Sequence, residues 1–266
     1  MTRGDERGAS APLILILSSF VAAGRVGGGS QVAALAALGV ETVLVPTVVF
    51  GRHPGLGAPG GGTTDIKTFE GVLTGVQAAG VFQALHAVIA GYFASGDQVA
   101  AAARTIDDIR AVNREAWIVV DPIMGDGDGG LYVDEAVAAA VAADLVRRAD
   151  LIAPNAWELQ RLSARAVADP TSAVAAGRSL GRPALVSSVA AGDDIGVVFV
   201  DAGQAWLAAH SRQTTAPKGT GDLLTALFTA ERLAGAAPRE ALAKSVAGVA
   251  RIVAGGDVDV RLEKLA

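Results

Sequence analysis

The chain has 266 residues, of which 51% are hydrophobic and 18% charged, with a net charge of −5 and no cysteine. The acidic balance and the lack of any Lys/Arg cluster exclude a nucleic-acid-binding face. The absence of cysteine excludes disulfides, thiolate nucleophiles and cysteine-zinc sites, and it fits the cytoplasmic location that we expect. A chain of this length can bury a substantial hydrophobic core without needing disulfides or bound metal ions.

The N-terminal region predicts a tail followed by a buried strand. Residues 1–11 are polar or small, and we expect a flexible tail there. The apolar run at residues 13–17 ends at Ser18, far short of a membrane-spanning helix. Asp5 and Glu6 do not fit the cationic start of a signal peptide. The run therefore predicts a strand buried on both faces, in a protein with no membrane partner.

Strands and helices then alternate. In chain order, the hydrophobic patterns predict a helix at 31–38, a strand at 41–50, a helix at 65–77, a strand at 85–90, a helix at 97–112 and a strand at 117–120. The segment 51–62 is too rich in glycine for a packed element. A loop of this length predicts a lid or a disordered segment.

The second half continues the alternation. It predicts a helix at 131–146, a strand at 151–153, a helix that carries Glu158, a helix at 169–180, a strand at 184–186, a hairpin of 195–200 and 205–209, and helices from Gly219, at 238–254 and at 261–266. This order predicts a single α/β domain over 12–266. We expect a three-layer α/β/α sandwich with a mostly parallel sheet and the C-terminal antiparallel hairpin at its edge. Neither a dinucleotide fingerprint nor a P-loop motif is present.

A glycine-rich loop opens one of the predicted helices. It reads Lys218-Gly219-Thr220-Gly221-Asp222 and precedes an apolar run with helical spacing. The first amides of a helix have no internal acceptor and lie at the positive end of its dipole. Glycines can bring these amides close to a phosphate. Asp222 is then either an ordinary helix-start residue or a base beside the transferred phosphate.

Three aspartates follow the strand at 117–120 in another glycine-rich loop. They are Asp121, Asp126 and Asp128. Magnesium takes carboxylate and phosphate oxygens as ligands, whereas the spacing and the missing terminal glutamate do not fit an EF-hand calcium loop. A solvated acidic turn is the alternative. The three histidines have no metal-ligand spacing.

Polar residues also follow other predicted strands. They are Ser19, Asn155 and the pair Ser187-Ser188. In parallel sheets, ligands bind beyond the carboxyl ends of the strands. Asn155 can also cap the helix that carries Glu158, and Ser19 can be a plain turn residue.

The order of these segments is similar to that of the ribokinase-like superfamily. The shared segments are Asp121-Pro-Ile-Met-Gly-Asp126, Ala153-Pro-Asn155-Ala-Trp-Glu158, Ser187-Ser188 and Gly219-Thr-Gly-Asp222. Within it, the chain resembles the pyridoxal kinase family over about residues 13–254. The segments that carry this second resemblance are Ser19 with Gly24 and Val26-Gly27, Val48-Val49-Phe50 with His53 and Gly55, and Gly91-Tyr92.

The resemblance implies an ATP-dependent kinase that phosphorylates the 5′-hydroxymethyl group of pyridoxal, pyridoxine or pyridoxamine, in salvage to pyridoxal 5′-phosphate. It implies that Asp222 takes the hydroxyl proton and that the amides of Gly219, Thr220 and Gly221 form the anion hole for the γ-phosphoryl group. The physical chemistry agrees, because phosphoryl transfer depends on alignment and charge stabilisation.

The resemblance also implies the remaining sites and partners. Asp126 and Glu158 would hold Mg²⁺ through water, and a monovalent cation such as K⁺ would assist. A homodimer is implied as well. The implied nucleotide residues are Asp121, Asn155, Ser187, Ser188, Lys218, Gly219, Thr220 and Gly221, and the implied substrate residues are Ser19, Val26, Val48, Phe50, His53, Tyr92 and Asp222.

Several residues depart from the family's pattern, among them Gly51 and Arg52, which stand where the family usually has serine and asparagine. Phe20 replaces a usual histidine, Gly28 an asparagine, Pro54 a threonine and Lys218 an uncharged residue. Pro54 removes a hydroxyl and an amide near the substrate, and Lys218 either pairs with phosphate or is merely exposed. The alternatives are therefore a kinase for hydroxymethylpyrimidine or another small alcohol, and a binding protein that has lost turnover.

Overall fold

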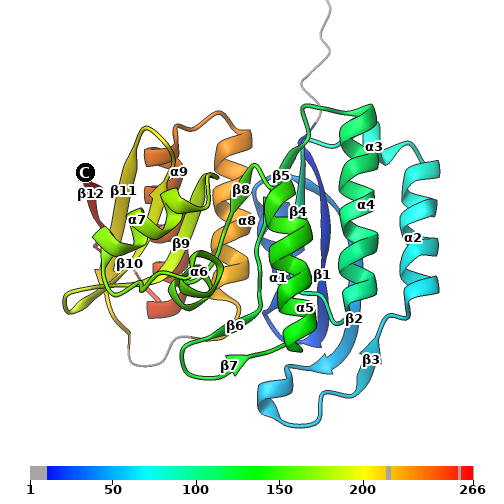
Figure 1. Ribbon diagram of the computed structural model, residues 1–266, viewed down its shortest axis with the longest axis horizontal. Coiled ribbons are helices and arrows are strands. Elements are labelled where there is room, and N and C mark those ends of the chain that lie inside the picture. Colours follow the sequence, from blue (N-terminus) through cyan, green and yellow to red (C-terminus); the bar gives the residue numbers. More distant parts are fainter. Residues whose placement is uncertain (1–10, 214–216, 257–258, 266) are drawn as a thin grey trace, which may run out of the picture.

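A computed structural model describes residues 11–213, 217–256 and 259–265 and shows one large sheet with helices on both faces (Figure 1). The strands are β1 (Leu13–Ala23), β2 (Glu41–Arg52), β3 (Gly61–Thr63), β4 (Ala87–Ala90), β5 (Trp117–Val120), β6 (Gly125–Asp126), β7 (Gly130–Leu131), β8 (Leu151–Ile152), β9 (Ala184–Ala191), β10 (Asp194–Val200), β11 (Ala205–Ser211) and β12 (Arg261–Leu265). The ten-stranded sheet has the order β12-β11-β10-β9-β8-β5-β4-β1-β2-β3, and β6 pairs with β7 apart from it.

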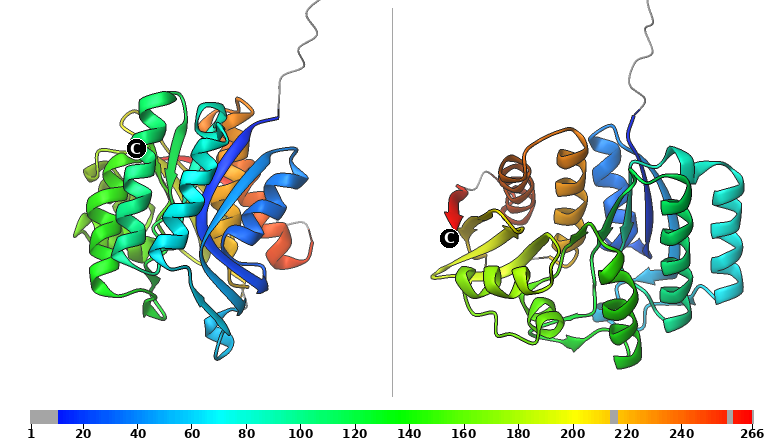
Figure 2. Two further views of the ribbon diagram at one scale, coloured as in Figure 1. Left: turned by 90° about the vertical axis from the view of Figure 1, so that its right-hand side faces the viewer. Right: turned by 45° about the horizontal axis from the view of Figure 1, so that its top comes forward.

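Helices form a layer on each side of the sheet. The α-helices are α1 (Gly27–Ala37), α2 (Ile66–Ala78), α3 (Val81–Ala84), α4 (Gly96–Val112), α5 (Glu135–Ala140), α6 (Ala156–Ser163), α7 (Pro170–Ser179), α8 (Thr220–Leu233) and α9 (Pro238–Ala254). Helices α1, α8 and α9 cover one face, and α2, α4 and α5 cover the other (Figure 2). The predicted α/β/α sandwich is thus confirmed.

Strand β1 illustrates why the sheet is buried on both faces. Ile14 and Ile16 pack into the core shared with α1, α8 and α9. Leu15 and Leu17 pack into the core beneath α2, α4 and α5, and none of the four is exposed. Successive side chains of a strand point to opposite faces, so a strand between two helical layers must be apolar throughout.

The central strands run in the same direction and therefore end at one edge. Parallel pairing connects β2, β1, β4, β5, β8 and β9 in turn. Their carboxyl ends lie at the lower edge in Figure 1, next to the β6–β7 hairpin. Ligands of open α/β sheets bind at such an edge.

The C-terminus differs from the prediction. Residues 261–265, predicted to be helical, form β12, which pairs antiparallel with β11. Leu262 and Leu265 contact opposite cores, as a strand with alternating sides requires. The predicted hairpin β10–β11 is present, but β12 covers it, so it does not lie at the sheet edge. Residue 266 lies outside the described residues.

The N-terminal half also extends beyond its predicted bounds. β1 continues to Ala23, and α1 begins at Gly27 rather than at residue 31. The segment 51–62 is not a plain loop, because its ends lengthen β2 and form β3, and a 3₁₀ turn η1 (Pro54–Leu56) lies at the tip. We call this exposed hairpin, residues 48–63, the flap.

The predicted helix at 131–146 is broken into shorter pieces. Gly130 and Leu131 belong to β7, and the helix begins only at Glu135. It continues as a π-helical turn η2 (Val141–Leu145) and a 3₁₀ turn η3 (Val146–Arg148). The prediction missed that Leu131 pairs with Gly125, which places Asp126 in a short hairpin.

The remaining predictions concern the N-terminal tail, membrane-spanning helices and the bounds of the domain. The predicted tail lies, except for Ala11, outside the described residues. Within the part of the chain that is described, no helix is both long and apolar enough to cross a bilayer. That residues 12–266 make a single domain stays a prediction.

Candidate active site

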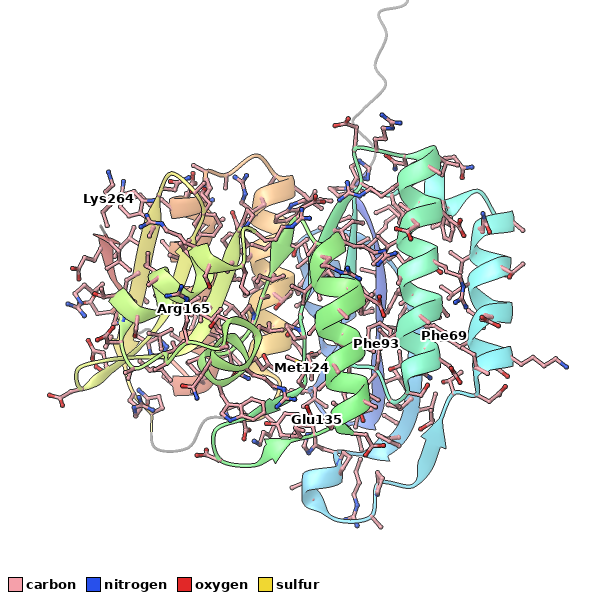
Figure 3. All side chains as sticks on the ribbon, in the orientation of Figure 1. Phe69, Phe93, Met124, Glu135, Arg165 and Lys264 are labelled. Atoms are coloured by element: carbon pink, nitrogen blue, oxygen red, sulfur yellow. The ribbon has the colours of Figure 1, made fainter. Side chains whose placement is uncertain are left out.

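The edge where the parallel strands end collects the predicted site residues. Tyr92 follows β4, Asp121 follows β5 and Asn155 follows β8. Ser187 lies in β9 and forms an isolated bridge to Asn155. Figure 3 labels Met124 and Glu135 at this same edge. Parallel topology thus brings together residues that are far apart in sequence.

Asp222 lies in the first turn of α8 with one carboxylate oxygen fixed and the other free. Its Oδ2 accepts a 2.8 Å hydrogen bond from the amide of Gly27, at the start of α1. Its Oδ1 is buried and has no partner. Burial raises the pKa of Asp222 to about 6, although the Gly27 amide opposes the shift. A carboxylate with one unpartnered oxygen is suited to accept a proton.

The start of α8 is packed tightly against the turn before α1. Gly219 has a left-handed backbone, with φ of 93°, and a Cβ there would lie 2.1 Å from the carbonyl oxygen of Arg25. Gly27 is similarly constrained, because a Cβ would lie 2.1 Å from Oγ of Ser19. Only glycine permits these contacts. They fix the amides that follow Gly219 relative to Asp222.

Asp121 is buried behind Asp222. Its Oδ2 accepts a 2.7 Å hydrogen bond from Oγ1 of Thr225, one turn further along α8. Burial, together with the charges of Asp222 and Glu158, raises the pKa of Asp121 well above its ordinary value. The three carboxyl groups therefore lie close enough to interact, and a cation bound at this edge would favour their ionised forms.

Glu158 connects the loop after β5 to helix α6. One oxygen accepts the amides of Met124 and Gly125, and the other accepts the amide of Asn155. Asn155 accepts the amide of Glu158 in return, which is the capping box, and its side-chain amide donates to the carbonyl of Gly125. Burial raises the pKa of Glu158 to about 7.

We expect Glu158→Ala to destabilise the fold. The change leaves three backbone amides without their acceptor, and Glu158 is only 2% exposed. The free energy of unfolding should fall by about 3 kcal/mol in denaturant titrations. The control is Glu135→Ala, which removes an exposed partner of Arg161 and should cost less than ~1 kcal/mol. Equal losses would contradict the structural role of Glu158.

Asp126 lies in the β6–β7 hairpin and accepts four donors. Oδ1 accepts the amides of Asp128 and Gly129, and Oδ2 accepts the hydroxyl of Tyr132 and Nζ of Lys218. Partial burial would raise the pKa of Asp126, but these hydrogen bonds lower it to about 2. Asp126 is therefore ionised near neutral pH.

These residues fit magnesium held through water rather than directly. Nowhere in the described part of the chain do three Asp, Glu or His side chains converge to form a metal cage. Every oxygen of Asp126 and Glu158 already accepts at least one hydrogen bond. Magnesium keeps several waters and completes its shell with phosphate oxygens, so an acidic edge without a cage is consistent with it.

The predicted nucleotide serines lie one strand away from this cluster. The amide of Ser187 donates to the carbonyl of Pro154. Ser188 is exposed and adopts a left-handed backbone, with φ of 59°. Such a conformation is uncommon for a residue other than glycine and often marks a functional site.

The predicted substrate residues lie along β1, β2 and the loop after β4. The side chain of Val48 is fully buried, whereas those of Ser19, Phe50 and Tyr92 are partly exposed. Burial raises the pKa of Tyr92, and the charge of Asp134 adds to the shift. Val26 precedes α1, and Nδ1 of His53 accepts the amide of Gly55 in the flap.

Comparisons with known proteins agree with this geometry. The family model described as phosphomethylpyrimidine kinase matches residues 62–262. A pyridoxine/pyridoxal/pyridoxamine kinase of Bordetella avium (strain 197N) is 40% identical over 240 residues, which cover 87% of this chain and 81% of the relative. The chain belongs to the pyridoxal kinase family.

Solved structures of this family share the fold. The pyridoxal kinase from Entamoeba histolytica superimposes with a TM-score of 0.88 at 20% identity, covering 96% of this chain and 100% of that chain. The pyridoxal kinase from Leishmania donovani in complex with ADP gives a TM-score of 0.83 at 25% identity, covering 91% and 86%. The similarity to the pyridoxal kinase family and its ribokinase-like fold, expected from the motifs, is confirmed.

The departures from the pyridoxal kinase pattern fit their local surroundings. A Cβ on Gly28 would lie 2.4 Å from Cδ1 of Leu44, so the usual asparagine would displace that side chain. Pro54 opens the 3₁₀ turn η1, a position that suits proline. Phe20 is 37% exposed and pairs with Val49 of β2.

The motifs of the pyridoxal kinase family did not reveal the residues that support the site. Ser18 accepts the amide of Tyr92, and Gln98 binds the carbonyls of Thr47 and Thr64. The side chains of Ser18 and Gln98 are fully buried. For Thr225 a signal existed, because it lies three residues after Asp222 and thus on the same side of α8.

Proposed function

We propose that this protein transfers the γ-phosphoryl group of ATP to the 5′-hydroxymethyl group of pyridoxal, pyridoxine or pyridoxamine. The observation that carries the proposal is the buried, unpartnered Oδ1 of Asp222 at the start of α8. Membership of the pyridoxal kinase family supports the substrate class, since the Bordetella avium relative is named for these three vitamers.

Asp222 is the base in this proposal. Its Oδ1 accepts the hydroxyl proton of the substrate, while the Gly27 amide keeps Oδ2 in place. The amides of Thr220 and Gly221, which follow Gly219, stabilise the charge that develops on the transferred group. One such donor contributes roughly 3 kcal/mol to the transition state.

ATP is the proposed phosphoryl donor, and the Leishmania donovani relative was solved with ADP. Asp121, Asn155, Ser187, Ser188 and Lys218 surround its phosphates in the proposal. Magnesium, when bound, neutralises charge on the phosphates. Asp126 and Glu158 are its proposed partners through water, and a potassium requirement stays a prediction.

The substrate pyridine lies between the flap and the loop after β4 in this proposal. Tyr92 contributes an aromatic side chain, and Ser19 and His53 contribute polar groups. Val26, Val48 and Phe50 complete the proposed apolar lining. The flap closes over the substrate and excludes water, which protects ATP from hydrolysis.

The rate should fall in acid, because a base acts only when it is ionised. With both substrates saturating, kcat should be constant above about pH 7 and fall ~tenfold per unit below about pH 6, near the raised pKa of Asp222. If kcat falls at the same pH with pyridoxal and with pyridoxamine, the group that titrates belongs to the enzyme and not to the substrate. A constant rate from about pH 5 to 8 would contradict the role of Asp222.

The direct test of function is ADP release from Mg-ATP with pyridoxal, pyridoxine, pyridoxamine or hydroxymethylpyrimidine as acceptor. Turnover on a B6 vitamer supports the proposal. Turnover on hydroxymethylpyrimidine alone would favour the second candidate, a hydroxymethylpyrimidine kinase. The family model that matches residues 62–262 supports this candidate, because it is described as phosphomethylpyrimidine kinase. If ATP binds and none of the four is phosphorylated, the protein is a kinase for another alcohol or a binding protein.

Two features of the proposal rest on family membership and composition. A homodimer is proposed by similarity, and light scattering of the purified protein measures it. A cytoplasmic location is proposed because the chain contains no cysteine. Fractionation of cells that express the protein tests the location.

A further inference from the structure

An ion pair connects the two segments that flank the proposed phosphate site. Nζ of Lys218 lies 3.2 Å from Oδ2 of Asp126, although the residues are 92 positions apart. Lys218 precedes the first turn of α8, and Asp126 lies in β6. The side chain of Lys218 is 65% exposed and that of Asp126 is 25% exposed, so a ligand can reach the ammonium group.

The carboxylate of Asp126 has no free acceptor position. Two amides donate to Oδ1, and Tyr132 and Lys218 donate to Oδ2. A carboxylate offers about four lone-pair sites in total. A water molecule of a hydrated cation can therefore bind Asp126 only after one of these donors has left.

Lys218 is the donor that can leave. The other three donors, from Asp128, Gly129 and Tyr132, belong to the same hairpin as Asp126, and the amide of Tyr132 is itself bound to the carbonyl of Met124. Lys218 reaches Asp126 from another element through a flexible stem. Ion pairs between exposed side chains are weak, so little opposes the release of Lys218.

A second partner for Lys218 would bind next to it. The neighbouring Gly219 is fixed against the carbonyl of Arg25, which holds the start of α8 in place. A phosphate bound at the amides of this turn would lie beside Lys218. Hydrogen bonds between an ammonium group and a phosphate are short and strong.

We propose that Lys218 is an exchangeable counter-ion of Asp126. It neutralises Asp126 in the free enzyme and leaves it for the phosphates of the incoming Mg-ATP, so that Asp126 becomes free to bind metal-held water. The inference rests on the proposed kinase function. Lys218 then has two effects of opposite sign, because it attracts the nucleotide and competes with magnesium for Asp126.

Calorimetric binding of a non-hydrolysable ATP analogue separates these effects. In EDTA, Lys218→Met should weaken binding ~10-fold, because a phosphate partner is lost. Asp126→Asn should instead strengthen it ~3-fold, because Lys218 is no longer held back, and this gain should vanish in the double variant. In a magnesium titration, added magnesium should increase the affinity for the analogue. Lys218→Met should lower the magnesium concentration at which half of this increase is reached.

Controls separate exchange from simpler roles. Lys244→Met removes an exposed lysine that pairs with Glu231 and Glu240 away from the site, and it should leave nucleotide binding unchanged. Lys218→Arg should retain binding in EDTA. An unchanged magnesium midpoint in Lys218→Met, or no gain in Asp126→Asn, would overturn the exchange. Failure of the wild-type protein to bind the analogue would instead overturn the proposed function.

Discussion

Asp222→Asn is expected to lower kcat about a thousandfold while leaving the affinity for Mg-ATP nearly unchanged. The amide keeps the size of the carboxylate, and its oxygen can still accept the hydrogen bond of the Gly27 amide. It cannot take a proton from the substrate hydroxyl. The measurements are ADP release under saturating substrates and calorimetric nucleotide binding.

The chain offers a matched control for this variant. Asp97 lies in the first turn of α4, as Asp222 does in α8, but it is exposed. Asp97→Asn should therefore leave kcat unchanged. If Asp222→Asn retained more than roughly a tenth of the rate, the assignment of the base would be wrong.

Gly219→Ala should cause the second large loss, with kcat reduced ~100-fold. The added Cβ would lie 2.1 Å from the carbonyl oxygen of Arg25, so the start of α8 must move away from the turn before α1. This displaces both the anion-binding amides and the carboxylate of Asp222. ADP release and the thermal midpoint of unfolding measure the two consequences.

Gly235→Ala separates this displacement from backbone strain. Gly235 follows the other end of α8 with a similarly left-handed φ of 87°, and no atom lies within 4 Å of a Cβ built there. Both variants should lose about 1 kcal/mol of stability through strain, and Gly219→Ala should lose more because of its contact with Arg25. Only Gly219→Ala should lose activity, and equal activities would show that the contact with Arg25 does not position the site.

The sequence predicted those helices and strands whose structure is determined by the pattern of the segment itself. Strand β5 and helix α9 have the predicted bounds, and α4 differs by one residue. A short apolar run is enough to predict β5, and a long segment with helical periodicity is enough to predict α4 and α9. The strand β12 was mistaken for a helix, because five residues with three charges carry little periodicity and its pairing with β11 lies in the tertiary structure.

The same division applies to the site. Asp222 and Gly219 could be singled out as candidates because a glycine-rich turn before an apolar helix has a local signature, and the family resemblance then implied their roles, which stay predictions. The anchor of Asp222, the amide of Gly27, lies 195 residues away and carries no side chain that a sequence could display. Gln98 was missed for the same reason, since its partners are the carbonyls of Thr47 and Thr64, which flank the flap and lie 51 and 34 residues away.

The bond between Gly27 and Asp222 also has a consequence for the synthesis of the protein. It joins α1 to α8, which are the first and the penultimate α-helix of the described residues. A ribosome-bound chain that has already folded its N-terminal strands contains Gly27 but still lacks Asp222, the proposed base. With Asp222 as the proposed base, phosphoryl transfer would require that α8 has emerged and docked, so chains that end before α8 should not consume ATP through this site.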